Sequence, residues 1–314
     1  MDGAANNTLL TDTPGEPTFF TAPHAQSLRP GQVGLIGAPV DALVTERRGA
    51  ADAPDVLRRR SVHTGSYSVS DRSLRKRRSG CVDVGNLRVD SATSAGELFE
   101  AVSRAVSTVV SAKAVPLLVG GDHSITYPAV TALAETHGTL RVVQIDAHVD
   151  ATDPSEWNCR WNHGTWLRNL IEDGAVKGED VTQIGVRDFQ YSESGPTFAA
   201  EHGVTMFTPE HYAARGAQAI INDLLKASDR PVYVTLDMDA VDPAFAPGTG
   251  EPMPGGLTSR EVLGLVRSVF ESDLNIVGAD LVEVVPVWDC AEITIALATN
   301  LLARMTDGLA GDIE

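Results

Sequence analysis

The chain has 314 residues and a mass of 33.3 kDa; 43% of its residues are hydrophobic and 21% are charged, which is typical of a globular protein. It carries 25 Lys and Arg against 42 Asp and Glu, so its formal charge is −17. This charge argues against wholesale binding to nucleic acid phosphates and against a polybasic membrane patch. No apolar run approaches the roughly 20 residues that a transmembrane helix needs.

The first 30 residues are polar and rich in Thr, Pro, Ala and Asn, which predicts an N-terminal arm outside the folded core. They contain no apolar segment of the kind found in secretory signals. The three cysteines Cys81, Cys159 and Cys290 lie far apart and are odd in number, so no disulfide framework is expected. These observations favour a reducing cytoplasm.

Beyond residue 30, short apolar runs alternate with helical patterns. The apolar runs are nearly continuous, which is typical of strands buried on both faces. They cover residues 33–36, 81–84, 115–119, 140–145, 181–184, 232–236 and 275–284. Helical periodicity covers residues 94–112, 125–135, 166–172, 209–227, 259–270 and 292–305. This alternation predicts an α/β fold with a parallel sheet covered by helices, and residues 31–314 are expected to form a single domain.

The basic stretch 72–78 reads RSLRKRR. We interpret it as a solvated loop in an acidic protein, with charge pairing across a subunit interface as one use for it. A localisation or anion-binding patch is the alternative.

Three polar segments each follow a predicted strand. GGDHS (120–124) follows VPLLV, DAHVD (146–150) follows RVVQI, and DMD (237–239) follows VYVTL. In open α/β sheets, ligands bind outside the carboxyl ends of the strands. We therefore expect the three segments to meet on one rim of the sheet.

These segments contain four carboxylates and two imidazoles that alternate along extended chain and so face the same side. They are Asp146, Asp150, Asp237, Asp239, His123 and His148. Like charges this close raise one another's pKa, and divalent cations are the natural compensation. A carboxylate-rich set with two histidines suits Mn²⁺ better than structural zinc, and six ligands suit two ions roughly 3.5–4 Å apart.

The same segments resemble the signatures of the ureohydrolase family, which includes arginase and agmatinase. The resemblance runs from about residue 33 to about residue 302, and it includes VDVGN (82–86), NHGT (162–165), QIGVRD (183–188), LDMDAVDPAFAPGTG (236–250), PGGLT (254–258) and DLVEVVP (280–286). It implies a three-layer α/β/α fold with a mainly parallel sheet of about eight strands. It also implies two Mn²⁺ per chain, hydrolysis of a guanidino group to urea and an amine, and a homo-oligomer (trimer or hexamer).

Carried over position by position, the resemblance also implies a role for each residue. One ion would be held by His123, Asp146, Asp150 and Asp237, and the other by Asp146, His148, Asp237 and Asp239, so that Asp146 and Asp237 bridge. Asp150 would also pass a proton to the leaving amine. His163 would be a proton shuttle, and Glu283 would pair with the substrate guanidinium.

Arginases hold the carboxylate of their substrate with a Ser-Gly-Asn in the loop before the counterpart of His163. Here residues 151–162 read ATDPSEWNCRWN, and the Ser-Gly-Asn is absent. Arginases also place an acid where this chain has Gln190. Both departures count against arginine as the substrate. The APGTGEPMPGGLT run (246–258) and the HGT segment (163–165) resemble the agmatinase and guanidino-acid hydrolase branch, which implies agmatine or 4-guanidinobutanoate as the small-molecule substrate.

Trp157, Trp161 and Trp166 crowd this same loop. They could pack at a subunit interface, or they could form an apolar wall for a substrate. In the second case the substrate could be a bulkier guanidino-bearing natural product made by a biosynthetic pathway. Arg160 and Arg168 could instead meet a substrate carboxylate, as 4-guanidinobutanoate would require.

Glu251 stands where relatives often have Thr, which leaves the shape of the pocket open. A non-catalytic homologue and the single-zinc deacetylases that share the fold remain as further alternatives. The complete set of six ligand residues argues against both.

Overall fold

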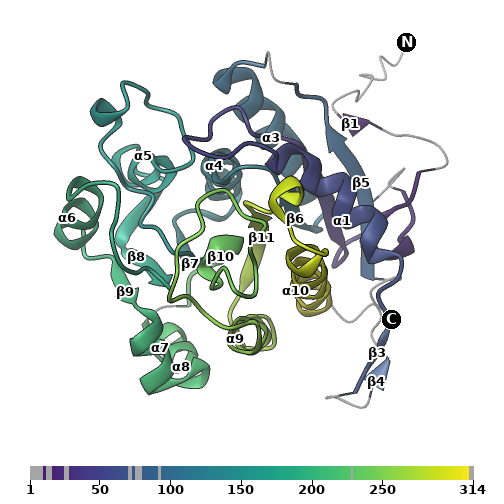
Figure 1. Cartoon of the computed structure of the whole chain (residues 1–314). Helices are drawn as coiled ribbons and strands as arrows, with labels where there is room; N and C mark the ends of the chain where they lie inside the picture. Colours follow the sequence, from purple (N-terminus) through teal and green to yellow (C-terminus); the bar gives the residue numbers. More distant parts are fainter. Residues whose placement is uncertain are drawn as a thin grey trace, which may run out of the picture.

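The computed structural model describes residues 10–11, 16–24, 28–69, 73–74, 80–90, 93–227 and 229–310. In these residues the chain forms three layers, a central sheet with helices on both faces (Figure 1). The nine strands lie in the order β1 (Leu10–Thr11), β5 (Cys81–Leu87), β2 (Val33–Ala38), β6 (Val115–Gly120), β11 (Ile276–Val282), β10 (Val232–Asp237), β7 (Leu140–Ile145), β8 (Val176–Ile184) and β9 (Thr205–Phe207). The eight strands from β5 to β9 run parallel, and β1 pairs antiparallel with β5. The expected α/β fold is confirmed.

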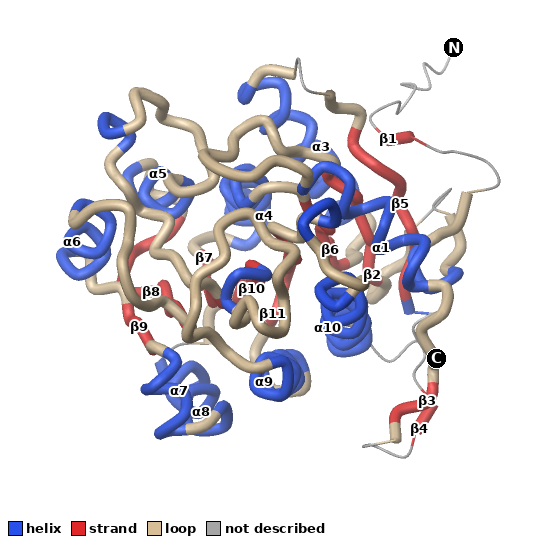
Figure 2. The backbone as a smooth tube through the Cα atoms, in the orientation of Figure 1, coloured by secondary structure: helices blue, strands red, loops and turns tan. Residues whose placement is uncertain are grey.

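The helices divide between the two faces of the sheet, as Figure 2 shows in blue. One face is covered by α1 (Ala53–Ser61), α10 (Ile293–Leu309), α9 (Ser259–Phe270), α8 (Ala217–Ala227) and α7 (Pro209–Arg215). The other face is covered by α3 (Ala95–Ser111), α4 (Thr126–His137), α5 (Trp166–Glu172) and α6 (Ser194–Glu201).

The alternation of side chains along β6 explains why the strands read as continuous apolar runs. Leu117 and Val119 are fully buried in the core under the first group of helices, and Leu118 is fully buried in the core under the second group. Successive residues of a strand point to opposite faces, so a strand covered on both sides is apolar at most of its positions.

The structure also contains elements that the sequence did not predict. β9 has only three residues, and α6 (SGPTFAAE) contains Gly and Pro, so neither gives a periodic signal. α1 (APDVLRRRS) carries three consecutive arginines that mask its apolar face. The single helix expected over 209–227 is two helices, because Gly216 has a φ of +74° that ends α7.

Part of the predicted N-terminal arm is packed into the core. Phe19 and Phe20 are buried, and their backbone N–H groups donate to Asp83 Oδ2 at 2.9 Å and to Ser61 Oγ at 2.8 Å. The Arg58 guanidinium lies 4.3 Å from the centre of the Phe19 ring. The arm was predicted to lie outside the core because most of its residues are polar, but Phe19 and Phe20 attach it to the core.

The buried Arg58–Asp83 pair gives a prediction on stability. Arg58 donates from Nε to Asp83 Oδ2 at 2.7 Å and from Nη2 to Oδ1 at 3.1 Å, and Asp83 is fully buried. Arg58→Ala should lower the free energy of unfolding by about 3–5 kcal/mol, because it leaves a buried carboxylate without its cation. Urea denaturation measures this. Arg104→Ala, which breaks only an exposed pair with Glu100, is the control and should cost less than about 1 kcal/mol. An equally small loss for Arg58→Ala would contradict the expectation.

Other sequence expectations are tested only in part. In the basic stretch 72–78 only Ser73 and Leu74 are described, in β4 (Ser73–Leu74) beside β3 (Tyr67–Ser68), and its arginines and lysine lie outside the described residues. None of the three cysteines forms a disulfide with another described residue. Within the described part of the chain, no helix has the length and apolar character to cross a bilayer.

The four central strands of the sheet end at the same level, at the carboxyl edge where the polar segments begin. β6, β11, β10 and β7 are neighbours, and the registers Leu281↔Val119 and Leu236↔Ile145 bring their ends level. The chain then turns sharply at Gly121, whose φ is +26°. A Cβ there would lie 2.5 Å from the Ala38 oxygen, so only glycine fits.

Candidate metal centre

The three polar segments meet at this edge of the sheet. His123 opens a short turn after β6, Asp146 and Asp150 follow β7, and Asp237 ends β10. These side chains are buried among the strand ends, with Asp146 fully enclosed and Asp150 exposed by 9%. The backbone of Asp150 adopts a φ of +53°, a left-handed conformation that a non-glycine residue adopts only when its surroundings enforce it.

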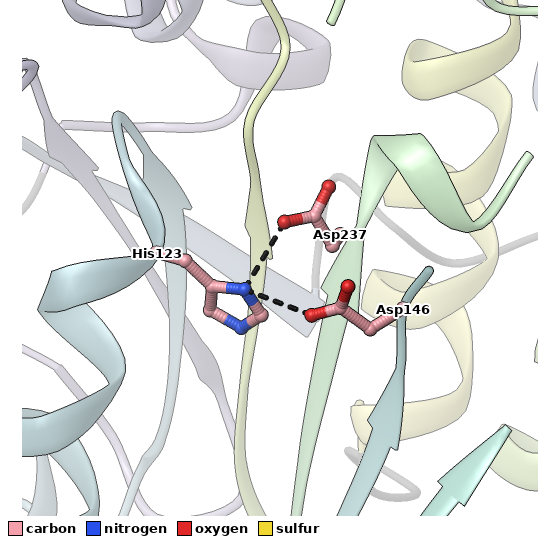
Figure 3. A group of neighbouring side chains, drawn as sticks. All are labelled: His123, Asp146 and Asp237. Atoms are coloured by element: carbon pink, nitrogen blue, oxygen red, sulfur yellow. Dashed lines mark ion pairs between the residues drawn. The ribbon is translucent and has the colours of Figure 1, made fainter. Parts of the chain in front are cut away.

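Three carboxylate oxygens converge on one imidazole nitrogen. His123 Nδ1 lies 3.1 Å from Asp146 Oδ2, 3.0 Å from Asp150 Oδ2 and 3.1 Å from Asp237 Oδ2, and Figure 3 shows the contacts to Asp146 and Asp237. Nδ1 nevertheless makes no hydrogen bond, while Nε2 is held by Thr235 Oγ1 at 2.7 Å. Four ligand atoms that face a common point without bonding to one another fit a shared cation.

A second group of ligand atoms lies beside the first. Atoms of Asp146, His148 and Asp239 lie within 4.8 Å of one another, with His148 Nδ1 2.9 Å from Asp239 Oδ2 and 3.7 Å from Asp146 Oδ1. Asp146 therefore presents Oδ2 to one group and Oδ1 to the other, as a bridging carboxylate does. Asp237 belongs only to the first group by distance, because its Oδ1 accepts the Asp239 N–H at 2.8 Å.

The charges of the cluster are poorly balanced without cations. Burial, followed by the negative charge of Asp146, raises the pKa of Asp150 to about 7. Burial, then the charges of Asp239 and Asp146, raise the pKa of Asp237 well above its usual value. Burial alone would lower the pKa of His123, but the surrounding carboxylates raise it well above the usual range. At neutral pH the metal-free cluster therefore retains protons that ligands must lose.

Metal binding should consequently release protons. Asp150 and His123 both have raised pKa values, so their protons compete with cations at low pH and are lost as pH rises through those values. We expect the apparent Mn²⁺ affinity to rise between pH 6 and pH 8, with net proton release at pH 7. Calorimetric titration in buffers of different ionisation enthalpy measures this. An affinity independent of pH, without proton release, would contradict the expectation.

His163 lies between two carboxylates. Its Nδ1 is 2.9 Å from Glu283 Oε1, and its Nε2 is 3.1 Å from Glu251 Oε1. Glu283 Oε1 also accepts the His123 N–H at 3.0 Å, whereas Oε2 is buried and has no hydrogen-bond partner. Sequence reasoning noted Glu251 as a departure from relatives but missed this contact, which joins residues far apart in the chain.

These groups line a cavity of about 880 Å³. Its floor includes His123, His148, Asp150, Asp237, Asp239, His163 and Glu283. Its walls come mainly from residues 42–47, 157, 159, 161–164, 188–191 and 251–254. Four loops, each placed by a different part of the chain, thus enclose the space above the carboxylate cluster.

Only some of the residues that the sequence suggested for substrate binding in the loop 157–166 line the cavity. Trp157 and Trp161 line the cavity, but Trp166 and Arg160 do not. Trp166 is 1% exposed and donates its indole N–H to Asp150 Oδ2 at 2.7 Å, so it supports the carboxylate cluster from behind. Arg160 donates to both oxygens of Asp173 at 2.7 Å and is already paired.

Gln190, which stands where arginases have an acid, has both ends of its amide occupied. Its Oε1 accepts the Val149 N–H at 3.0 Å, and its Nε2 donates to the carbonyls of Ala147 and Arg187 at 3.1 and 2.9 Å. It braces the loop after β7, and its polar atoms are used within the protein.

Comparisons with known proteins agree with this architecture. The family model described as Arginase family matches residues 31–307. Proclavaminate amidinohydrolase of Streptomyces clavuligerus is 39% identical over 92% of this chain and 91% of its own, and the mitochondrial agmatinase of Gallus gallus is 34% identical over 88% and 81%.

Solved structures show the same fold. The Streptomyces clavuligerus proclavaminate amidinohydrolase matches with a TM-score of 0.84 at 37% identity, over 94% of this chain and 97% of that one. Arginase from Bacillus caldovelox matches with a TM-score of 0.75 at 26% identity, over 89% and 98%. The family resemblance found in the sequence is thereby confirmed, and the chain belongs to the arginase family.

Proposed function

We propose that this protein is an amidinohydrolase that cleaves the guanidino group of agmatine, 4-guanidinobutanoate or a similar compound to urea and a primary amine. The observation that carries the proposal is the pair of ligand groups that share Asp146 on the floor of a cavity. The agmatinase, guanidinopropionase and guanidinobutyrase among the relatives support this substrate type.

The proposed ligands fit two Mn²⁺ ions. His123, Asp146, Asp150 and Asp237 would hold one, and Asp146, His148, Asp237 and Asp239 the other. The donor set of carboxylates and imidazoles, without thiolates, suits that metal. When bound, such ions would supply the chemistry of a nucleophile at neutral pH by lowering the pKa of water.

Glu283 and Asp150 would act on the substrate. The unpartnered Oε2 of Glu283 is a buried acceptor for guanidinium N–H groups, and this pairing would orient the guanidino carbon toward the ligand cluster. Asp150 uses only Oδ2 in its contacts with described residues, which leaves Oδ1 to carry a proton to the leaving amine. His163, between Glu283 and Glu251, would exchange protons with the solvent side of the cavity.

Arginine is disfavoured because Gln190 is neutral and already fully bonded. A bulkier guanidino natural product stays open, since the relative named proclavaminate amidinohydrolase covers most of the chain. By analogy with the family we also propose a homo-oligomer, a trimer or hexamer. The cysteine usage favours a cytoplasmic location.

A urea-release assay on the Mn²⁺-loaded protein tests the proposal. The panel is arginine, agmatine, 4-guanidinobutanoate, 3-guanidinopropanoate, guanidine and one large guanidino compound. We expect turnover of agmatine or 4-guanidinobutanoate and little of arginine. Silence toward every guanidino compound, with the ions bound, would refute the proposed activity.

A further inference from the structure

The cavity is larger than a short guanidino compound needs. Its volume of about 880 Å³ lies near the top of the roughly 300–1,000 Å³ found for pockets that enclose drug-sized ligands. Agmatine extended from Glu283 would occupy only the part beside the carboxylate cluster. The outer part is therefore available to recognise something further along the substrate.

Aromatic rings line this outer part. Phe189 is 88% exposed and Tyr191 is 65% exposed, and both line the cavity. The ring of Trp157 packs against Tyr191 with centroids 4.7 Å apart. Exposed aromatic side chains grouped at a cavity mark a surface that binds a flat apolar group favourably, because binding removes the rings from water.

One cation on the cavity wall has no charged partner. Arg47 makes no ion pair or hydrogen bond through its guanidinium within the described part of the chain, and the guanidinium lies 5.0 Å from the centre of the Trp288 ring. An arginine resting on an aromatic face is held in place while its N–H edges remain free to bind an anion.

The position of Arg47 suits the far end of a substrate. The backbone N–H of Thr45 lies 3.0 Å from His163 Nε2, so the loop touches the proposed catalytic floor at that point. Arg47 follows two residues later, at most about 7 Å further along the chain, and its side chain extends the reach. Glu46 and Asp188 also line the cavity, but both are exposed and remain hydrated.

The arginines that the sequence suggested for a carboxylate are engaged elsewhere. Arg160 pairs with Asp173, and Arg168 contacts Glu172 at 2.8 Å and Asp153 at 3.2 Å. Neither lines the cavity. Arg47, which carries no signature in the sequence, takes their place.

We propose that Arg47 binds a carboxylate at the outer end of the cavity, and that the substrate is a guanidino acid with a ring-bearing apolar body between the two groups. This inference rests on the proposed amidinohydrolase function and specifies its substrate class. The guanidino group would lie against Glu283, the body against Trp157, Phe189 and Tyr191, and the carboxylate on Arg47.

Matched probes test this on the Mn²⁺-loaded full chain. Agmatine is acylated on its amine with a 4-carboxybenzoyl, a 4-carbamoylbenzoyl or a 4-(aminomethyl)benzoyl group, so that the probes differ mainly in distal charge. We expect kcat/KM for urea release to be about 10- to 100-fold higher for the carboxylate than for the amide, the range of a hydrogen bond to a charged group. The amine probe should be the poorest.

Variants identify the residue responsible. Arg47→Gln should reduce the carboxylate-to-amide ratio to about one, and Arg47→Lys should retain part of the ratio. Arg104→Gln, on the exposed face of α3, is the matched control and should leave the ratio as in the wild type. Tyr191→Ala should raise KM for the benzoyl probes more than it raises KM for agmatine.

The failures are distinguishable. If the protein turns over agmatine or 4-guanidinobutanoate, any of three results on the benzoyl probes would overturn the inference alone. These results are equal rates on the carboxylate and amide probes, no activity on either of them, and a preference for the amine probe. An unchanged ratio in Arg47→Gln would do the same. No urea from any guanidino compound, with the ions bound, would overturn the proposed function as well.

Discussion

Asp237→Asn is expected to remove bound metal and to lower urea release by more than about 100-fold. Asp237 Oδ2 lies 3.1 Å from His123 Nδ1 in the group that would hold the first ion, so the change removes both a ligand oxygen and a negative charge. Residues that only support metal ligands already cost about 10- to 100-fold when replaced, and a ligand should cost more. Metal analysis after dialysis and the urea assay measure the two effects together. Retention of both ions with full turnover would show the ligand assignment to be wrong.

In the absence of metal, we expect Asp237→Asn to be at least as stable toward unfolding as the wild type. The pKa of Asp237 is raised well above its usual value, first by burial and then by Asp239 and Asp146. A carboxyl whose pKa is higher in the folded chain than in the unfolded chain destabilises the fold at every pH above the unfolded value. Asn removes that charge and keeps the oxygen that caps the Asp239 N–H.

Thermal denaturation in EDTA at pH 8 should therefore give Asp237→Asn a Tm equal to or above that of the wild type. Asp223→Asn, at a surface ion pair with Arg215, is the control and should change Tm little. A Tm several degrees below wild type for Asp237→Asn would mean that this carboxylate holds the fold together in its own right.

His163→Ala should lower turnover by about 100- to 10,000-fold, the usual contribution of general acid–base catalysis, while both ions stay bound. The ring nitrogens contact Glu283 and Glu251, and neither nitrogen joins a ligand group. Added imidazole should restore part of the rate, which a merely structural role would not explain. His137→Ala, at the exposed end of α4, is the control and should leave turnover unchanged. Loss of metal in His163→Ala would make this residue a ligand.

The strands that carry the site were predictable because both of their faces are buried. β6, β7 and β10 read as nearly continuous apolar runs, and the polar segments begin where each run ends. The edge strand β9 and the helices α1 and α6 were missed because short or charged elements leave little periodic pattern. The hydrophobic pattern of a sequence therefore predicts buried strands well, and short exposed elements poorly.

The outer cavity could not be predicted in the same way. Three tryptophans occur within residues 157–166. Trp157 and Trp161 line the cavity wall, whereas Trp166 lies behind Asp150. Thr45 and Glu251 are bonded through their side chains at 2.6 Å although they are 206 residues apart. Such contacts between loops depend on how the whole sheet places them, and a single sequence carries no local signal for them.

A Mn²⁺ titration of the metal-free protein, followed by both metal content and urea release from the best substrate of the panel, tests the central claim most directly. Two ligand groups that share Asp146 predict that activity rises to a plateau at two equivalents of Mn²⁺ per chain. Full activity at one equivalent, or full activity without bound metal, would contradict a binuclear amidinohydrolase.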